Sequence, residues 1–165
     1  MIISVCPAYL PSVEYMSWVI NQKKLYFLTS GHYQKQTYRN RAEIYGPNGK
    51  LKLIIPVTKN RGSNRQKDIE TMIDNNFLWQ KNHWRSLQMS YRASPYFEFY
   101  EEDFYPFYNN KISSLMELNI GLIKVVLKLL KLEIPIEEKN DNKVKEKRDL
   151  IIYKKIVNAS ILKYN

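Results

Sequence analysis

The residues best suited to chemistry come directly after two short apolar runs near the start of the chain. Cys6 follows the run from Ile2 to Val5, and His32 follows the run from Leu25 to Thr29. A thiolate nucleophile needs a nearby base or cation to lower its pKa, so these two side chains are candidate catalytic partners. The alternative is that Cys6 is a small buried apolar residue and His32 an ordinary loop residue.

A stretch that mixes aromatic rings with cations begins at the same histidine. Cations beside aromatic faces suit the binding of a phosphate or carboxylate next to a ring-shaped group, and the alternative is a hydrated basic loop. The residues of this stretch are His32, Tyr33, Lys35, Tyr38, Arg39 and Arg41.

Two further polar residues lie at helical spacing among apolar ones. Trp79 and His83 are four apart and share a helix face, which makes His83 a candidate acid or base; the alternative is an inert histidine bonded to a neighbour. Asn119 lies in an apolar stripe, where an unpaired amide costs about 1–3 kcal/mol. We therefore expect Asn119 to bond another backbone segment, which we favour, or a ligand.

Other motifs of catalysis and cofactor binding are missing from the sequence. It has no glycine-rich loop that cradles a phosphate, no cysteine and histidine cluster at metal spacing and no Gly-x-Ser-x-Gly elbow. We therefore expect no cofactor and no metal. The aromatic and acidic block from Tyr96 to Tyr108 has the composition to stack on a sugar, although such blocks are more often packing.

The sequence pattern predicts the helices and strands that position these residues. Together they indicate an α/β fold with a small, mainly parallel sheet. The chain opens as strand, loop, helix and strand, the order of a βαβ unit, with Ser12 as the helix N-cap. The loops at 6–11 and 30–35 should then be neighbours at the carboxyl edge of the sheet, where ligands bind in such folds. Between Glu43 and Val57, Gly46-Pro47-Asn48-Gly49 predicts a β-hairpin, because Asn-Gly supplies positive φ angles.

The second half of the chain is predicted to be mainly helical. Apolar residues recur at helical spacing from Leu78 to Ala93 and again from Ile112 to Leu130. The whole chain, 1–165, is expected to form one domain. Its other segments are interpreted as a surface loop at 59–67, a short strand at 69–73, a polar loop or linker at 137–149 and a last strand at 150–157.

Charge and cysteine content narrow the partners and the compartment. The chain has 26 Lys and Arg against 16 Asp and Glu, and its net charge of +10 favours an anionic small molecule. Its lysines are scattered, so nucleic acid is a less favoured partner. A single cysteine and a start without a leader pattern predict a cytoplasmic protein. Lysines interrupt the longest apolar stretch, 122–132, so no membrane span is expected.

Taken in order, several short motifs resemble the WbqC family. They are Pro7-Ala8-Tyr9-Leu10-Pro11 with Tyr15, Tyr33-Gln34-Lys35 with Asn40-Arg41, Pro47-Asn48-Gly49 with Pro56-Val57, Asp74, Trp79, His83-Trp84, Tyr91, Ser94-Pro95-Tyr96-Phe97 and Leu118-Asn119. The resemblance runs from Met1 to about Pro135, and the segments after Arg148 resemble an abbreviated form of the family's tail. The chain departs from the family pattern at two places. Many members have His-Gln before the first motif, where this chain has Val5-Cys6. The family's tail has an acidic residue at the position that Lys163 occupies in this chain.

The resemblance implies a role in bacterial surface-polysaccharide biosynthesis, as an acyl- or aminoacyl-transferase that modifies a nucleotide- or lipid-linked amino sugar. It implies a substrate site in which Arg41 and Lys35 hold a phosphate or carboxylate and Tyr9 packs on the ring. Two alternatives remain, a non-catalytic carbohydrate- or protein-binding module and a nucleic-acid binder. The full set of implied site residues is Tyr9, Pro11, Lys35, Asn40 and Arg41, with His83 as an outer member.

Overall fold

The computed structural model describes residues 3–58, 66–140, 145–146 and 151. Most of the expected loop at 59–67 and of the expected last strand at 150–157 lies outside these residues. The described elements, in chain order, are β1 (Ile3–Ser4), α1 (Val13–Val19), β2 (Leu25–Leu28), β3 (Arg41–Gly46), β4 (Gly49–Ile54), the 3-10 helix η1 (Asp68–Glu70), α2 (Trp79–Tyr91), α3 (Phe97–Asn109), α4 (Leu115–Leu129), β5 (Ile136–Lys139) and β6 (Lys145–Glu146).

The N-terminal unit is the expected βαβ unit. The Ser12 hydroxyl accepts a hydrogen bond of 3.2 Å from the backbone N–H of Tyr15 and so caps α1. Val5, just after β1, pairs in parallel with Phe27 of β2. Strands β1 and β6 also pair in parallel, as do β2 and β5, which confirms a small, mainly parallel sheet.

The polar segment after α4 contributes strands, so the expectation of a loop at 137–149 is wrong for residues 137–139 and 145–146. Backbone hydrogen bonds hold β5 to β2, among them one of 3.0 Å from Thr29 N to the oxygen of Lys139. Glu137 forms ion pairs with Lys24 and Lys139. Charged residues therefore fit this strand, because their side chains pair at the surface while the backbone completes the ladder.

Strands β3 and β4 form the predicted hairpin. Their register runs from the pair Arg41 and Ile54 to the pair Gly46 and Gly49. The detail of the turn differs from the expectation, because Gly49 has a φ of 103° whereas Asn48 is not among the residues with positive φ. Pro47 and Asn48 occupy the two central positions, where proline sets an ordinary negative φ.

Helices α2 and α4 confirm the two predicted helical segments. The aromatic and acidic block at 96–108 forms a further helix, α3, which contains Pro106. The segment at 69–73 is only partly strand-like. Ile69 lies in η1, whereas Met72 and Ile73 form isolated bridges to Ser114 and Val57.

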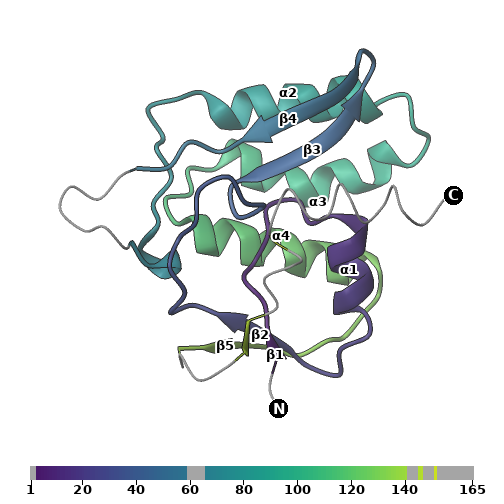
Figure 1. Ribbon diagram of the computed structural model, residues 1–165. Coiled ribbons are helices and arrows are strands. Elements are labelled where there is room, and N and C mark those ends of the chain that lie inside the picture. The colour runs from purple at the N-terminus through teal and green to yellow at the C-terminus, as the bar shows by residue number, and fades with distance from the viewer. Residues whose placement is uncertain (1–2, 59–65, 141–144, 147–150, 152–165) are drawn as a thin grey trace, which may run out of the picture.

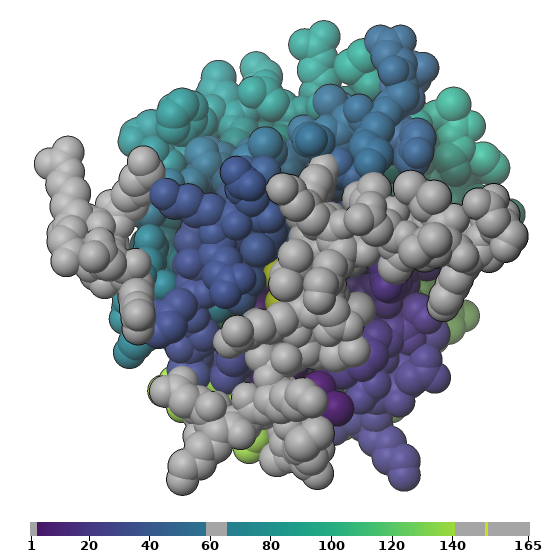
Figure 2. All heavy atoms as spheres, viewed as in Figure 1, coloured from purple at the N-terminus to yellow at the C-terminus, as the bar shows by residue number. Residues whose placement is uncertain are grey.

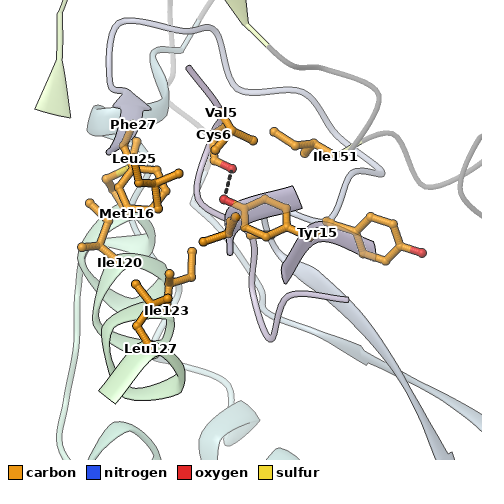
Figure 3. Close-up of a cluster of buried hydrophobic side chains, with 13 residues drawn as sticks. Val5, Cys6, Tyr15, Leu25, Phe27, Met116, Ile120, Ile123, Leu127 and Ile151 are labelled. Carbon is orange, nitrogen blue, oxygen red and sulfur yellow. Dashed lines mark hydrogen bonds between the residues drawn. The ribbon is translucent and has the colours of Figure 1, made fainter. Parts of the chain in front are cut away.

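The core has two parts, and α4 contributes to both. Figure 1 shows α4 in the middle of the molecule, with the strands of the parallel sheet on one side and the hairpin, α2 and α3 on the other. The first core, drawn in Figure 3, packs Val5, Leu25, Phe27, Ile123 and Ile151. The second core packs Tyr9, Ile44, Trp79, Tyr108 and Leu118. No helix in the described part of the chain is both long and apolar enough to cross a membrane.

Candidate functional site

The loop that follows β1 contacts the segment that follows β2, at a residue just beyond the predicted range 30–35. The backbone N–H of Tyr9 donates a hydrogen bond of 2.8 Å to the oxygen of Tyr38. Leu10 and Gln36, one in each loop, have positive φ angles of 42° and 59°. Such angles are uncommon for residues other than glycine, so surrounding contacts hold both loops in specific conformations. Figure 2 shows atoms of the segment after β2 (blue) at the surface between the N-terminal unit (purple) and the helices (teal).

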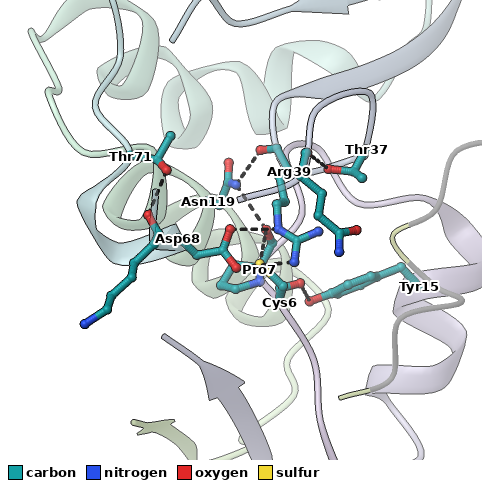
Figure 4. A network of polar contacts seen from close by, with 10 residues as sticks. Cys6, Pro7, Tyr15, Thr37, Arg39, Asp68, Thr71 and Asn119 are labelled. Carbon is teal, nitrogen blue, oxygen red and sulfur yellow. Dashed lines mark hydrogen bonds and ion pairs between the residues drawn. The ribbon is translucent and has the colours of Figure 1, made fainter. Parts of the chain in front are cut away.

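Asn119 joins both loops to α4, which confirms its predicted structural role. Its amide nitrogen donates to the backbone oxygens of Pro7, at 3.1 Å, and Arg39, at 2.7 Å. Figure 4 shows these two bonds converging on one side chain. Because Asn119 is 2% exposed, water does not compete for them, and the amide fixes how the loops lie relative to each other.

A buried ion pair lies beside Asn119. The guanidinium of Arg39 donates to the Asp68 carboxylate at 2.9 and 3.3 Å, and both side chains are buried. Gly31 makes room for it, since a Cβ there would lie 2.6 Å from Asp68 Oδ2. The adjoining cavity, lined in part by Cys6 and Asn119, has a volume of about 10 Å³. It has room for about one water molecule and none for a substrate.

Tyr9, His83 and Tyr108 form a buried chain of hydrogen bonds. The Tyr9 hydroxyl lies 2.9 Å from His83 Nδ1 and 3.0 Å from the Tyr108 hydroxyl. Burial lowers the pKa of His83 from 6.5 to about 4, although a hydrogen bond with the backbone of Ile54 opposes the shift. His83 is therefore neutral at pH 7.

The three candidate catalytic residues occupy separate places. Cys6 is buried in the first core, and its Sγ lies 3.9 Å from the backbone oxygen of Pro7. His32 is exposed, and its backbone pairs with Lys67. His83 lies beside Trp79 and Tyr9 next to the second core, and in the described part of the chain no hydrogen bond joins any two of the three candidates.

The cationic part of the predicted site centres on Arg41. This first residue of β3 is half-buried, and its Nε is enclosed with no hydrogen-bond partner among the described residues. Burial raises the pKa of Tyr33 to about 12, and the nearby charges of Arg41 and Arg39 oppose that shift. Tyr33 is therefore within electrostatic range of both guanidinium groups.

The other implied residues have different surroundings. The Asn40 amide nitrogen donates to the oxygen of Ile55 at 2.8 Å, whereas its Oδ1 is buried with no partner. Lys35 is exposed and Pro11 is half-buried. Sequence reasoning missed Asp68 and Tyr108 as parts of this region. It included Tyr33 in a mixed aromatic and cationic stretch and in a family motif, but not among the implied site residues.

A half-buried guanidinium without a carboxylate suits an anionic ligand. Desolvation of a charge is costly unless the charge is paired, and arginine presents a planar set of donors to a phosphate or carboxylate. Tyr33, within electrostatic range of that cation, adds an aromatic ring and a hydroxyl to the same region. The arrangement can therefore bind an anion attached to a ring.

Comparison with known proteins identifies the family. The model of the WbqC-like protein family matches residues 6–162, and the chain belongs to this family. It is also similar to the uncharacterized protein Rv1507c of Mycobacterium tuberculosis (strain ATCC 25618 / H37Rv), with 28% identity over 123 residues. That match covers 74% of this chain and 52% of the relative, so the chain spans about half of the relative's length. No solved structure matches the chain.

Proposed function

We propose that the protein is an acyl- or aminoacyl-transferase that modifies a nucleotide- or lipid-linked amino sugar in bacterial surface-polysaccharide biosynthesis. The observation that carries the proposal is the half-buried Arg41 without an anionic partner in the described part of the chain. Arg41 would bind the phosphate or carboxylate of the substrate, and the exposed Lys35 would add a second cation. Family membership supports the polysaccharide setting.

Ring recognition in this proposal belongs to Tyr33. Tyr9 has no exposed surface, so it cannot pack on a sugar without opening the second core. Tyr33 is half-buried and within electrostatic range of Arg41, which supports a single ligand that contacts both side chains. Tyr9 instead supports the loop through its bonds to His83 and Tyr108.

Proton removal from the acceptor amine falls to His32 in this proposal. Transfer of an acyl group to an amine forms the amide bond and breaks the bond to the donor's leaving group, and a base must take the proton that the amine loses. His32 follows β2 and is exposed, whereas His83 is enclosed and neutral. Replacement of His32 by Gln should therefore abolish turnover and leave binding unchanged.

Thermal unfolding with nucleotide sugars tests the binding step. We expect a UDP-linked amino sugar to raise the Tm of the wild type and to leave the Tm of Arg41→Ala unchanged, because the variant lacks the anion partner. Arg85→Ala is the matched control, since Arg85 is an exposed arginine on α2 and should keep the ligand response. A panel of such ligands that leaves the wild-type Tm unchanged would contradict the proposal.

The second candidate function is a non-catalytic carbohydrate-binding module. It is favoured by the burial of Cys6 and by the neutral, enclosed His83, which remove two of three candidate catalytic groups from the surface. Mass spectrometry of the amino sugar after incubation with acyl donors separates the two functions. Binding of the amino sugar without a change in its mass indicates the carbohydrate-binding module.

A third function, nucleic-acid binding, is indicated if the protein binds different anionic ligands without regard to their identity and the affinity falls steeply with salt concentration.

A further inference from the structure

A hollow of about 580 Å³ lies between the end of α4 and the start of β5. It shares no lining residue with the candidate anion site. Its lining includes Leu127, Ile134 and Ile136, so much of its surface is apolar. The volume falls in the range of small-molecule sites, roughly 300–1,000 Å³.

The hollow arises from the way in which α4 ends. Lys131 has a φ of 55°, and the N–H groups of Lys131 and Leu132 donate to the oxygens of Lys128 and Leu127, both at 2.9 Å. This pair of bonds is a Schellman motif, which reverses the chain at a helix end. Residues 132–136 therefore run back beside α4, and Ile134 and Ile136, two apart, point to the same side.

The rim of the hollow carries more positive than negative charge. Lys124 and Lys128 lie on successive turns of α4, and Glu133 is the carboxylate that lines this hollow in the described part of the chain. Lys128 is paired with Asp103 at 2.8 Å, an exposed contact that contributes little energy. Lys124 has no ion pair among the described residues, so its ammonium group is available to an anion.

We propose that this hollow binds an apolar anion, a carboxylate or phosphate attached to an alkyl or aryl group. The tail would lie on the half-buried side chains of Leu132, Ile134 and Ile136, and the anionic head would lie between Lys124 and Lys128. A neighbouring hollow of about 350 Å³ also includes Lys124, but Glu117 and Glu138 line it. Those carboxylates repel an anion, which assigns the head group to the first hollow.

Calorimetric titration of the whole protein with decanoate, decyl phosphate and decanol, all below their micellar concentrations, tests this proposal. Decanoate and decyl phosphate should bind, and decanol should bind about tenfold more weakly, because one charge contact is worth roughly that factor. A preference for one anion identifies the head group. Equal affinity for decanol and both anions, or no binding by any of them, would overturn the proposal.

Three variants locate the binding. Lys124→Ala should weaken decanoate binding about tenfold, and Lys111→Ala, the loss of an exposed lysine that lines neither hollow, should have no effect. Arg41→Ala should also leave decanoate binding intact, which keeps this result separate from the nucleotide-sugar test. Loss of binding in Arg41→Ala with no change in Lys124→Ala would overturn the assignment to this hollow.

Discussion

His83 illustrates how burial decides the chemistry of a single residue. The unfolded histidine takes up a proton near pH 6.5, whereas the folded one does so only near pH 4. The unfolded chain therefore binds more protons between these values. The stability that comes from the neutral ring is complete above pH 6.5 and is lost as the pH falls toward 4, by about 3 kcal/mol in total.

Replacement of His83 by Gln should remove this part of the pH dependence. We expect the wild type to lose more free energy of unfolding than His83→Gln between pH 7 and pH 4.5, measured by urea denaturation at each pH. His32→Gln is the matched control, because His32 is exposed, and it should follow the wild type. Parallel curves for all three proteins would contradict the placement of His83.

Asn119 offers a second test at the scale of one residue. Asn119→Leu keeps a similar volume but leaves the buried oxygens of Pro7 and Arg39 without this donor. We expect a loss of about 2–4 kcal/mol in the free energy of unfolding. Asn82→Leu, the same change at an exposed position of α2, should alter stability by less than about 0.5 kcal/mol.

The sequence predicts Asn119 but not its surroundings, for a physical reason. An amide inside an apolar stripe needs a partner, and that requirement can be recognised locally. The chain of Tyr9, His83 and Tyr108 joins residues 74 and 99 positions apart, which no local pattern encodes. Asp68 lies between the exposed residues Lys67 and Ile69, so nothing in its segment indicates a buried ion pair.

At the scale of elements, periodicity explains which predictions succeeded. The hairpin, α2 and α4 carry clear turn or amphipathic patterns, and the structure confirms them. Helix α3 contains Pro106, a residue that usually breaks a helix, and its mixed aromatic and acidic composition does not by itself indicate one. Strand β5 has a polar sequence that does not indicate a strand. Backbone pairing with β2 holds it in place, and this pairing requires no apolar face.

The contact between α3 and α4 can be tested at Gly121. A Cβ at this position would lie 2.5 Å from Cε1 of Phe107, so Gly121→Ala should cost about 1–3 kcal/mol through overpacking. The double variant with Phe107→Leu should recover part of that loss. Gly49→Ala is the contrasting control: its φ of 103° imposes backbone strain in open space, so Phe107→Leu should not relieve it. Full additivity at Gly121 and Phe107 would contradict the contact.

At the scale of the whole molecule, α4 should make the two cores unfold together. Ile151→Ala in the first core and Leu118→Ala in the second each remove a fully buried side chain, at a cost of about 2–5 kcal/mol. Trp18 packs against the first core and Trp79 lies in the second, so single-tryptophan variants report on each. We expect coincident urea transitions at both tryptophans. Separate midpoints would show two independent units.

The pairing of the sheet also determines when the chain can fold during its synthesis. Strand β1 pairs with β6 at Lys145 and Glu146, and β2 pairs with β5 at residues 136–139, so each N-terminal strand has a partner more than 100 residues downstream. On a ribosome that releases the chain from its N-terminus, the edge of β1 that pairs with β6 and the edge of β2 that pairs with β5 stay open until those residues emerge. Strands β1 and β2 are therefore made well before their partners but completed as structure only after them, and the nascent chain exposes open strand edges while the intervening segment is translated.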